Sequence, residues 1–200
     1  FIKYRIMNKS GLVWDSTYIS MPSDPDIGDA SDDALGCDST RSLSYSYNFD
    51  NSDPDYGANP PAVGTRVLQS PLFFTGSNND TAKLPYDTLI GYKPTNMSGF
   101  NRFFNGGNAC NGDPDEAPRA YEFMRGKDGC GNTIINWVTN QPTTFRYSGN
   151  ACFKTGWYDS TAGGKRGIMN MGPVTMNPGD TQIIVLSYMI TRDGGNNNLN

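Results

Sequence analysis

The segment Ser42-Leu43-Ser44-Tyr45-Ser46-Tyr47 carries the clearest structural signal in the chain. Large apolar or aromatic side chains alternate with serine, and this period of two is typical of a β-strand buried on one face. We therefore predict a strand here, with its tyrosine face turned towards the core and its serine face turned towards solvent.

Other stretches also carry strand signals. Apolar residues alternate with Lys3 and Arg5 over residues 2–6, and residues 12–20 are expected to return as the second strand of a hairpin. Residues 182–191 form a nearly continuous apolar run. Such a run is typical of a strand covered on both faces, either in the middle of a sheet or under a partner.

The composition indicates the same fold class. The chain has 23 Gly and 13 Pro among 200 residues, which suits many turns, and its Tyr and Phe content favours strands. We predict an all-β fold, an antiparallel β-sandwich of jelly-roll type with long Asp/Gly/Asn-rich loops. Residues 1–193 are expected to form a single domain and residues 194–200 a flexible C-terminal tail.

Residue types that are missing or scattered exclude several function classes. The chain contains no histidine, which excludes Ser-His-Asp and Cys-His catalysis and histidine-ligated zinc. Its net charge is −4 and its basic residues are dispersed, so we expect no nucleic-acid partner. No apolar run reaches the roughly 18 residues of a membrane-spanning helix, so we expect no membrane insertion. We expect the protein not to be an enzyme.

An acidic loop points to a cation. Six aspartates lie within the fifteen residues 24–38 without a basic residue among them, and residues 53–55 repeat the Asp-Pro-Asp triplet of residues 24–26. Clustered carboxylates repel one another unless a cation neutralises them, and oxygen ligands suit Ca²⁺. A solvated acidic loop without any ion is the alternative. The candidate calcium ligands are Asp24, Asp26, Asp29, Asp32, Asp33, Asp38, Asp53 and Asp55.

The cysteines predict an oxidising compartment. Cys37, Cys110, Cys130 and Cys152 are widely spaced and even in number, which favours two disulfides over four reduced, buried thiols. Three pairings are possible. Cys110–Cys130 is favoured because it would link a Gly/Asn-rich loop to the turn at residues 129–131. We therefore expect an extracellular or cell-surface protein.

Sugar attachment and sugar binding are both suggested by short motifs. N-x-S/T triplets begin at Asn8, Asn79 and Asn96. Asp-Ser or Asp-Thr triplets, which resemble an O-glycosylation signal of secreted Bacteroidetes-type proteins, contain Ser16, Ser39, Thr81, Thr88 and Ser160. Trp157 and Tyr158, in a glycine-flanked loop, are candidates for an aromatic sugar-binding platform, with core packing as the alternative.

Several segments in order resemble a known kind of surface protein. They are residues 15–18, 24–28, 32–38, 47–48, 56–62, 155–157, 172–173 and 178–181. Together they resemble a β-rich region of large secreted proteins of the Bacteroidetes and Ignavibacteria type, which often carry a C-terminal sorting domain for export across the outer membrane. The resemblance implies a cell-surface location and no particular activity.

These observations rank three functions. The first is an extracellular structural protein, a calcium-stabilised and glycosylated subunit of a surface fibre or filament. Its copies would join by β-strand pairing through residues 1–7 or 182–191, so its partner is itself. The alternative is a carbohydrate-binding or adhesive module of a larger secreted protein, with glycans as its partner. A carboxylate-dependent hydrolase, with two acidic residues across a groove, ranks third.

Overall fold

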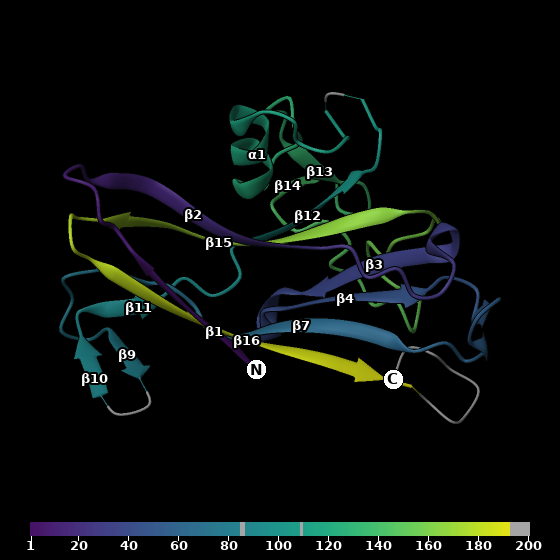
Figure 1. Ribbon diagram of the computed structural model, residues 1–200, viewed down its shortest axis with the longest axis horizontal. Coiled ribbons are helices and arrows are strands. Elements are labelled where there is room, and N and C mark those ends of the chain that lie inside the picture. Colours follow the sequence, from purple (N-terminus) through teal and green to yellow (C-terminus); the bar gives the residue numbers. More distant parts are fainter. Residues whose placement is uncertain (85–86, 109, 193–200) are drawn as a thin grey trace.

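The computed structural model describes residues 1–84, 87–108 and 110–192, and Figure 1 shows two antiparallel sheets stacked in layers. The all-β prediction is confirmed. The larger sheet has the strand order β1 (Ile2–Met7), β16 (Thr181–Thr191), β7 (Ala62–Gln69), β4 (Leu43–Asn48) and β3 (Asp33–Asp38). The smaller sheet has the order β12 (Gly99–Phe104), β15 (Lys165–Met176) and β2 (Trp14–Ser23).

The main core lies between these sheets. Leu35, Ile184 and Leu186 of the larger sheet and Phe100 and Met169 of the smaller sheet belong to one cluster of buried side chains. Burial of such side chains away from water is the main favourable term in folding. The two sheets therefore stabilise each other.

Short elements decorate the two sheets. They are the hairpins β5 (Ser52–Asp53) with β6 (Gly57–Ala58), β9 (Thr81–Leu84) with β10 (Asp87–Ile90) and β13 (Ile134–Asn136) with β14 (Gln141–Thr143), the pair β8 (Leu72–Phe74) with β11 (Tyr92–Pro94), the helix α1 (Ala117–Met124), and two 3-10 turns, Ala30–Asp32 and Ser39–Arg41. No helix among the described residues is long and apolar enough to cross a membrane. The predicted tail, residues 194–200, lies outside the described residues.

The predicted strand at residues 43–47 forms, but its faces differ from the prediction. Ser44 and Ser46 are buried, and with Phe100 they line a crevice between the two sheets. Tyr45 and Tyr47 pack on the opposite face, against Ala151 from a later loop. The alternation was interpreted correctly as a strand, but both faces are covered, and the serine face is the one directed towards the other sheet.

The predicted N-terminal hairpin is wrong. The strand β1 pairs with β16 in the larger sheet, whereas β2 pairs with β15 in the smaller sheet. The chain therefore crosses between the sheets at residues 8–13. Asn8 holds this crossing, because its buried side-chain amide donates to the carbonyl oxygens of Leu12 and Met176 at 2.8 and 2.9 Å. Residues 182–191 do form an interior strand of the sheet, although Tyr188, Met189 and Ile190 at its end are exposed.

One side of the molecule is closed by a segment that we call the capping segment, residues 143–163. Against β3, the amide of Cys37 donates to the Tyr147 carbonyl and the amide of Gly163 donates to the Asp33 carbonyl. Against β12, the amide of Phe100 donates to Thr144 and its carbonyl accepts from Arg146. Edge strands expose unpaired backbone groups that invite pairing with another chain, and this segment satisfies them in both sheets.

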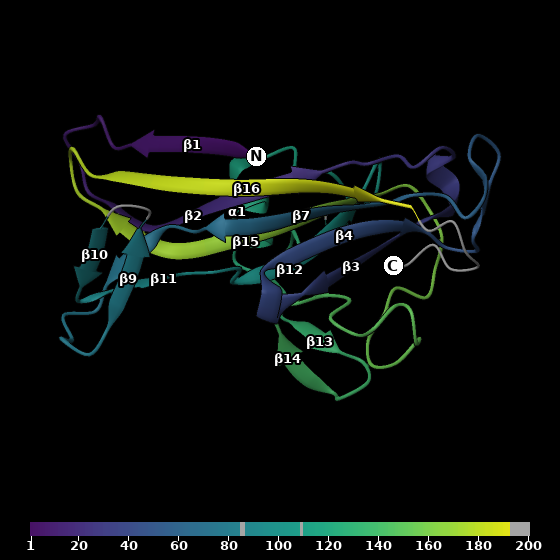
Figure 2. The ribbon, with the colours of Figure 1, turned by 90° about the horizontal axis from the view of Figure 1, so that it is seen from below.

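On the opposite side of the molecule, neither sheet has a further strand among the described residues, although the Tyr121 hydroxyl of α1 donates to the Ser16 carbonyl of β2 at 2.8 Å. The outermost strands there are β1 in the larger sheet and β2 in the smaller sheet, and Figure 2 shows β1 at the border of its sheet, next to β16. Residues 2–5 of β1 are exposed. The amide of Asn8 donates to Asp180, so the alternation of an antiparallel ladder directs the backbone groups of Lys3 and Arg5 away from β16.

The cysteines form one of the two expected disulfides. Cys110 and Cys130 are bonded, as the favoured pairing predicted. Cys37 and Cys152 are not bonded to each other, so the prediction of a second disulfide is wrong. Cys37 is buried with its sulfur directed at the carbonyl of Arg146, 3.3 Å away, and burial raises the pKa of this thiol to about 12. Cys152 lies exposed on the capping segment.

The disulfide provides a stability prediction. Cys110 and Cys130 are separated by 20 residues. Closing a loop of this length restricts the unfolded chain, so the double variant Cys110→Ser/Cys130→Ser should lose about 3 kcal/mol of unfolding free energy. Urea denaturation of both proteins, with and without reductant, measures this loss. Reductant should lower the urea midpoint of the parent protein only. Equal midpoints for parent and variant without reductant would contradict the prediction.

Candidate functional site

Two aspartates of the predicted calcium loop form ion pairs with arginines. The Asp24 carboxylate accepts from Arg166 Nε at 2.6 Å, and Asp113 binds the same guanidinium at 2.5 Å. Together these two carboxylates raise the pKa of Arg166. The Asp38 carboxylate contacts Arg41 Nη1 at 2.5 Å and also caps the turn that follows. The charges of Asp24 and Asp38 are therefore balanced within the chain by arginines, and calcium binding by these two residues stays a prediction.

The carboxylate of Asp53 lies where the two acidic loops meet. It accepts from the backbone amides of Asp29, Asp55 and Tyr56 at 2.7–2.9 Å. Gly28 has a φ of +71°, and a Cβ there would lie 2.2 Å from both Asp53 carboxylate oxygens. Only glycine allows the backbone to approach this carboxylate so closely. Asp55 follows in an exposed turn.

Asp32 and Asp33 carry the least compensated charge of this loop. Asp33 is 3% exposed, and its Oδ2 accepts from the Ile27 amide at 3.0 Å. Burial raises the pKa of Asp33 to about 7, with smaller contributions from nearby carboxylates, including that of Asp26. Burial and repulsion by Asp53 also raise the pKa of Asp32. One oxygen of each residue, Oδ1, is buried without a hydrogen-bond partner.

The fit of this cluster to calcium is partial. The donor type suits the ion, and the two unpartnered oxygens would be satisfied by a cation. However, no three carboxylates among the described residues place one oxygen each within 4.8 Å of one another. Ligands around calcium lie roughly 2.3–2.6 Å from the ion, so an ion here would contact about two carboxylates unless the loop moved. Cys110, Asp128 and Cys130 meet that spacing, but both of their sulfurs are in the disulfide.

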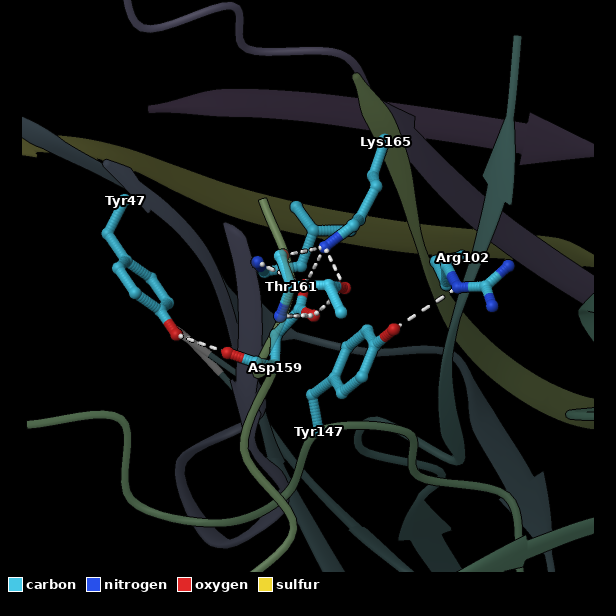
Figure 3. A network of polar contacts seen from close by, with 7 residues as sticks. Tyr47, Arg102, Tyr147, Asp159, Thr161 and Lys165 are labelled. Atoms are coloured by element: carbon cyan, nitrogen blue, oxygen red, sulfur yellow. Dashed lines mark hydrogen bonds and ion pairs between the residues drawn. The ribbon is translucent and has the colours of Figure 1, made fainter. Parts of the chain in front are cut away.

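A second polar site, which sequence analysis did not identify, is buried behind the capping segment (Figure 3). Lys165 Nζ lies 2.6 Å from Asp159 Oδ2, and each side chain is 1% exposed. Nζ also donates to the carbonyl oxygen and the hydroxyl of Thr161, the latter at 3.1 Å. Burial lowers the pKa of Lys165, and Asp159 partly opposes this effect.

Asp159 connects the capping segment to the edge of the larger sheet. Its Oδ2 accepts from the Leu35 amide of β3 at 3.1 Å, and its Oδ1 lies 3.2 Å from the Thr161 hydroxyl. The Tyr47 hydroxyl donates to its backbone carbonyl at 3.4 Å. Asp159 stands six residues before Lys165, and a single lysine at a strand start resembles an ordinary surface residue, so no sequence signal predicted this pair.

Aromatic side chains surround the buried pair. The Tyr147 hydroxyl accepts from Arg102 Nε at 3.2 Å, and the Lys165 ammonium lies 5.9 Å from the centre of the Tyr147 ring. Trp157 packs against Tyr147 edge to face, with ring centres 5.8 Å apart. Trp157 is therefore buried and cannot form the predicted sugar-binding platform, and Tyr158 is half-buried. This is a correction: the aromatic residue belongs to the core.

The predicted glycosylation residues fall into two groups. Asn8 is fully buried, and its side chain is engaged in hydrogen bonds, so its sequon is not available to a glycan. The other candidates are exposed: Asn79, Asn96, Ser16, Ser39, Thr81, Thr88 and Ser160.

An open groove of about 670 Å³ lies at the end of the molecule that carries β8 and β11. Phe73, Phe74 and Tyr92 supply its aromatic wall, and Asp15 and Asp180 supply carboxylates. The Phe74 ring is 68% exposed and lies 5.1 Å from that of Tyr92, centre to centre. The groove has no local sequence signal, because its residues come from distant parts of the chain.

Comparison of the chain with models of protein families, with curated proteins and with solved structures found no match.

The buried Asp33 carboxyl predicts a pH dependence of stability. Its pKa is raised from 3.8 to about 7, so the folded state keeps a proton that the unfolded chain releases across this window. The unfolding free energy, measured in excess chelator, should fall by roughly 2–4 kcal/mol as pH rises from about 4 to 8. Added calcium should recover part of this loss at pH 8.

Two variants test the assignment of this pH dependence. Asp33→Asn should remove most of the slope, because the amide does not titrate, whereas the exposed Asp55→Asn control should keep it. Urea denaturation across the pH range measures each slope. A parent protein whose stability is flat between these pH values, or an unchanged slope in Asp33→Asn, would contradict the prediction.

Proposed function

We propose that the protein is an extracellular structural subunit that associates with copies of itself through the open side formed by β1 and β2. The main support for this proposal is that the strand edges are covered on one side of the molecule and not on the other. The capping segment satisfies the strand edges β3 and β12, whereas β1 presents unpaired backbone groups beside exposed Phe1, Ile2 and Tyr4. Backbone pairing at such an edge provides a strong and sequence-tolerant joint.

Charge supports a second copy as the partner. The strand β1 carries Lys3 and Arg5 and no acidic residue, whereas β2 carries Asp15 and no basic residue. A two-fold axis between two copies can bring β1 of one against β2 of the other and repeat the contact. Opposite charges then face each other in both halves of the joint, which favours this pairing over one between two basic strands.

Because β1 and β2 lie on the same side, strand pairing between two copies would use both edges of each copy. Strand pairing alone would therefore give a dimer. A fibre would therefore be built from such pairs through a second contact. Calcium is proposed to stabilise the loop around Asp32 and Asp33, and glycans on the exposed Ser, Thr and Asn sites to cover the remaining surface. The disulfide supports an oxidising, extracellular location, and we assign the chain no catalytic activity on an external substrate.

Proline variants test the strand-pairing joint. Arg5→Pro removes an amide that is directed away from β16, so the subunit should fold but lose self-association. The control Arg5→Ala removes the charge alone and should weaken association without abolishing it. Analytical ultracentrifugation over a range of concentrations, with electron microscopy in calcium and after chelation, measures assembly. A parent protein that stays monomeric at high concentration would contradict the proposal.

A second candidate function is carbohydrate binding in the groove beside β8 and β11. The specific observation is the exposed Phe74 ring next to Tyr92, with carboxylates of Asp15 and Asp180 in the same groove. An apolar wall with a few convergent polar groups is typical of ligand sites.

This candidate predicts saturable binding of polysaccharides, measured by calorimetric titration. Phe74→Ala should weaken binding by up to about tenfold, since an aromatic contact is worth roughly 0.5–1.5 kcal/mol. Trp157→Phe, in the core, is the matched control and should leave the affinity unchanged. Binding that is insensitive to Phe74→Ala would exclude the groove as the site.

A further inference from the structure

We propose that Lys165 and Asp159 become joined by an amide bond between Lys165 Nζ and Asp159 Cγ, which the folded chain forms by itself with the release of one water molecule. The product is an internal cross-link between the start of β15 and the capping segment. The inference is independent of self-association, because both reacting groups belong to one subunit.

The geometry brings the two groups together in the absence of bulk water. Nζ lies 2.6 Å from Oδ2, and both side chains are 1% exposed. Holding two reactants in contact replaces a bimolecular encounter by a unimolecular step with an effective concentration that can reach about 10⁵ M or more. Burial also protects the product, because hydrolysis of the amide would need a water molecule at the same place.

Neighbouring groups lie where the reaction needs them (Figure 3). The Thr161 hydroxyl is 3.1 Å from Nζ and 3.2 Å from Asp159 Oδ1, so it bridges the nucleophile and one carboxylate oxygen. The Leu35 amide donates to the other oxygen, Oδ2, at 3.1 Å. A backbone donor at this oxygen would stabilise the negative charge that develops on it during attack.

The atoms and protons of this step balance. The ammonium passes one proton through the Thr161 hydroxyl to Oδ1, which leaves a neutral amine facing a neutral carboxyl group. The Nζ lone pair attacks Cγ, the C–N bond forms, and Oδ2 takes the negative charge beside the Leu35 amide. A second proton follows the same hydroxyl to Oδ1, the Cγ–Oδ1 bond breaks and water leaves. The third proton stays on the amide nitrogen, and no oxidant or reductant is required.

Burial favours the neutral reactants and the neutral product. Desolvation lowers the pKa of Lys165, which increases the fraction of reactive free amine. Two buried charges each carry a desolvation penalty that their mutual attraction often fails to recover. The amide has no charge, its oxygen can keep the Leu35 donor, and its N–H can keep the Thr161 carbonyl as acceptor.

Mass spectrometry of the reduced, denatured full chain tests the proposal directly. The expected mass is that of the sequence less one water molecule. Trypsin cuts after free lysine, so it should fail to cut after Lys165 and should cut instead after Arg166. A wild-type chain of full sequence mass that trypsin cuts after Lys165 would show an ordinary ion pair and overturn the proposal.

Three variants locate the chemistry. Lys165→Arg keeps the positive charge and the contact with Asp159 but has no amine that can condense, so it should have its full sequence mass. Thr161→Val keeps the shape and removes the bridging hydroxyl, so the water loss should slow at least tenfold, whereas Thr161→Ser should restore it. A water loss that persists in Lys165→Arg, or that is equally fast in Thr161→Val, would overturn the assigned bond or the assigned proton relay.

Discussion

The hydrogen bonds between the capping segment and two strand edges are the constraint on which the rest of the structure depends. One stretch of chain, residues 143–163, pairs with β3 in the larger sheet and with β12 in the smaller sheet. Without it, backbone groups of both sheets would lose their partners, and the Tyr45 and Tyr47 face of β4 would be exposed. The segment has little regular structure of its own, and beside these backbone bonds the Asp159 side chain fixes its position by contacts with the Leu35 amide and with Lys165.

The molecule treats its buried charges in two different ways. Asp159 and Lys165 neutralise each other, and each of them also has a further hydrogen-bond partner. Asp32 and Asp33 form no ion pair with the described residues, although Asp33 is near enough to Lys165 to raise its pKa slightly, and each retains a buried oxygen without a hydrogen bond. A buried ion pair whose charges cancel can hold a loop in place. Two buried carboxylates without a counter-ion are favourable only when they are protonated or when a cation binds. We therefore expect the pH dependence of stability to come from Asp32 and Asp33 and not from the Asp159–Lys165 pair.

The two sides of the molecule differ in how the outermost strands of the sheets are covered. The capping segment provides hydrogen-bond partners for one edge of each sheet. None of the described residues provides a comparable cover for β1. Natural proteins usually protect such edges with charges, and Lys3 and Arg5 serve that purpose for an isolated subunit. In the proposed pair of subunits, the same charges would lie opposite Asp15 of β2 from a second copy. Protection of the edge and the proposed association would thus depend on the same few residues.

Local sequence was sufficient for several of the strands and for one disulfide, but not for residues 121–124, whose apolar side chains suggest a strand and which lie in the helix α1. Alternation at residues 43–47, the apolar run at residues 182–191 and the spacing of Cys110 and Cys130 depend on near neighbours, and each predicted feature is present. Partners that lie far apart in the chain could not be inferred in this way. Period two shows that a strand has two faces, but only tertiary packing decides that Ser44 and Ser46 face the other sheet and that Trp157 is buried. Likewise, Asp159 and Lys165 become a site because folding removes both from water, and burial is a property of the whole fold rather than of any short segment.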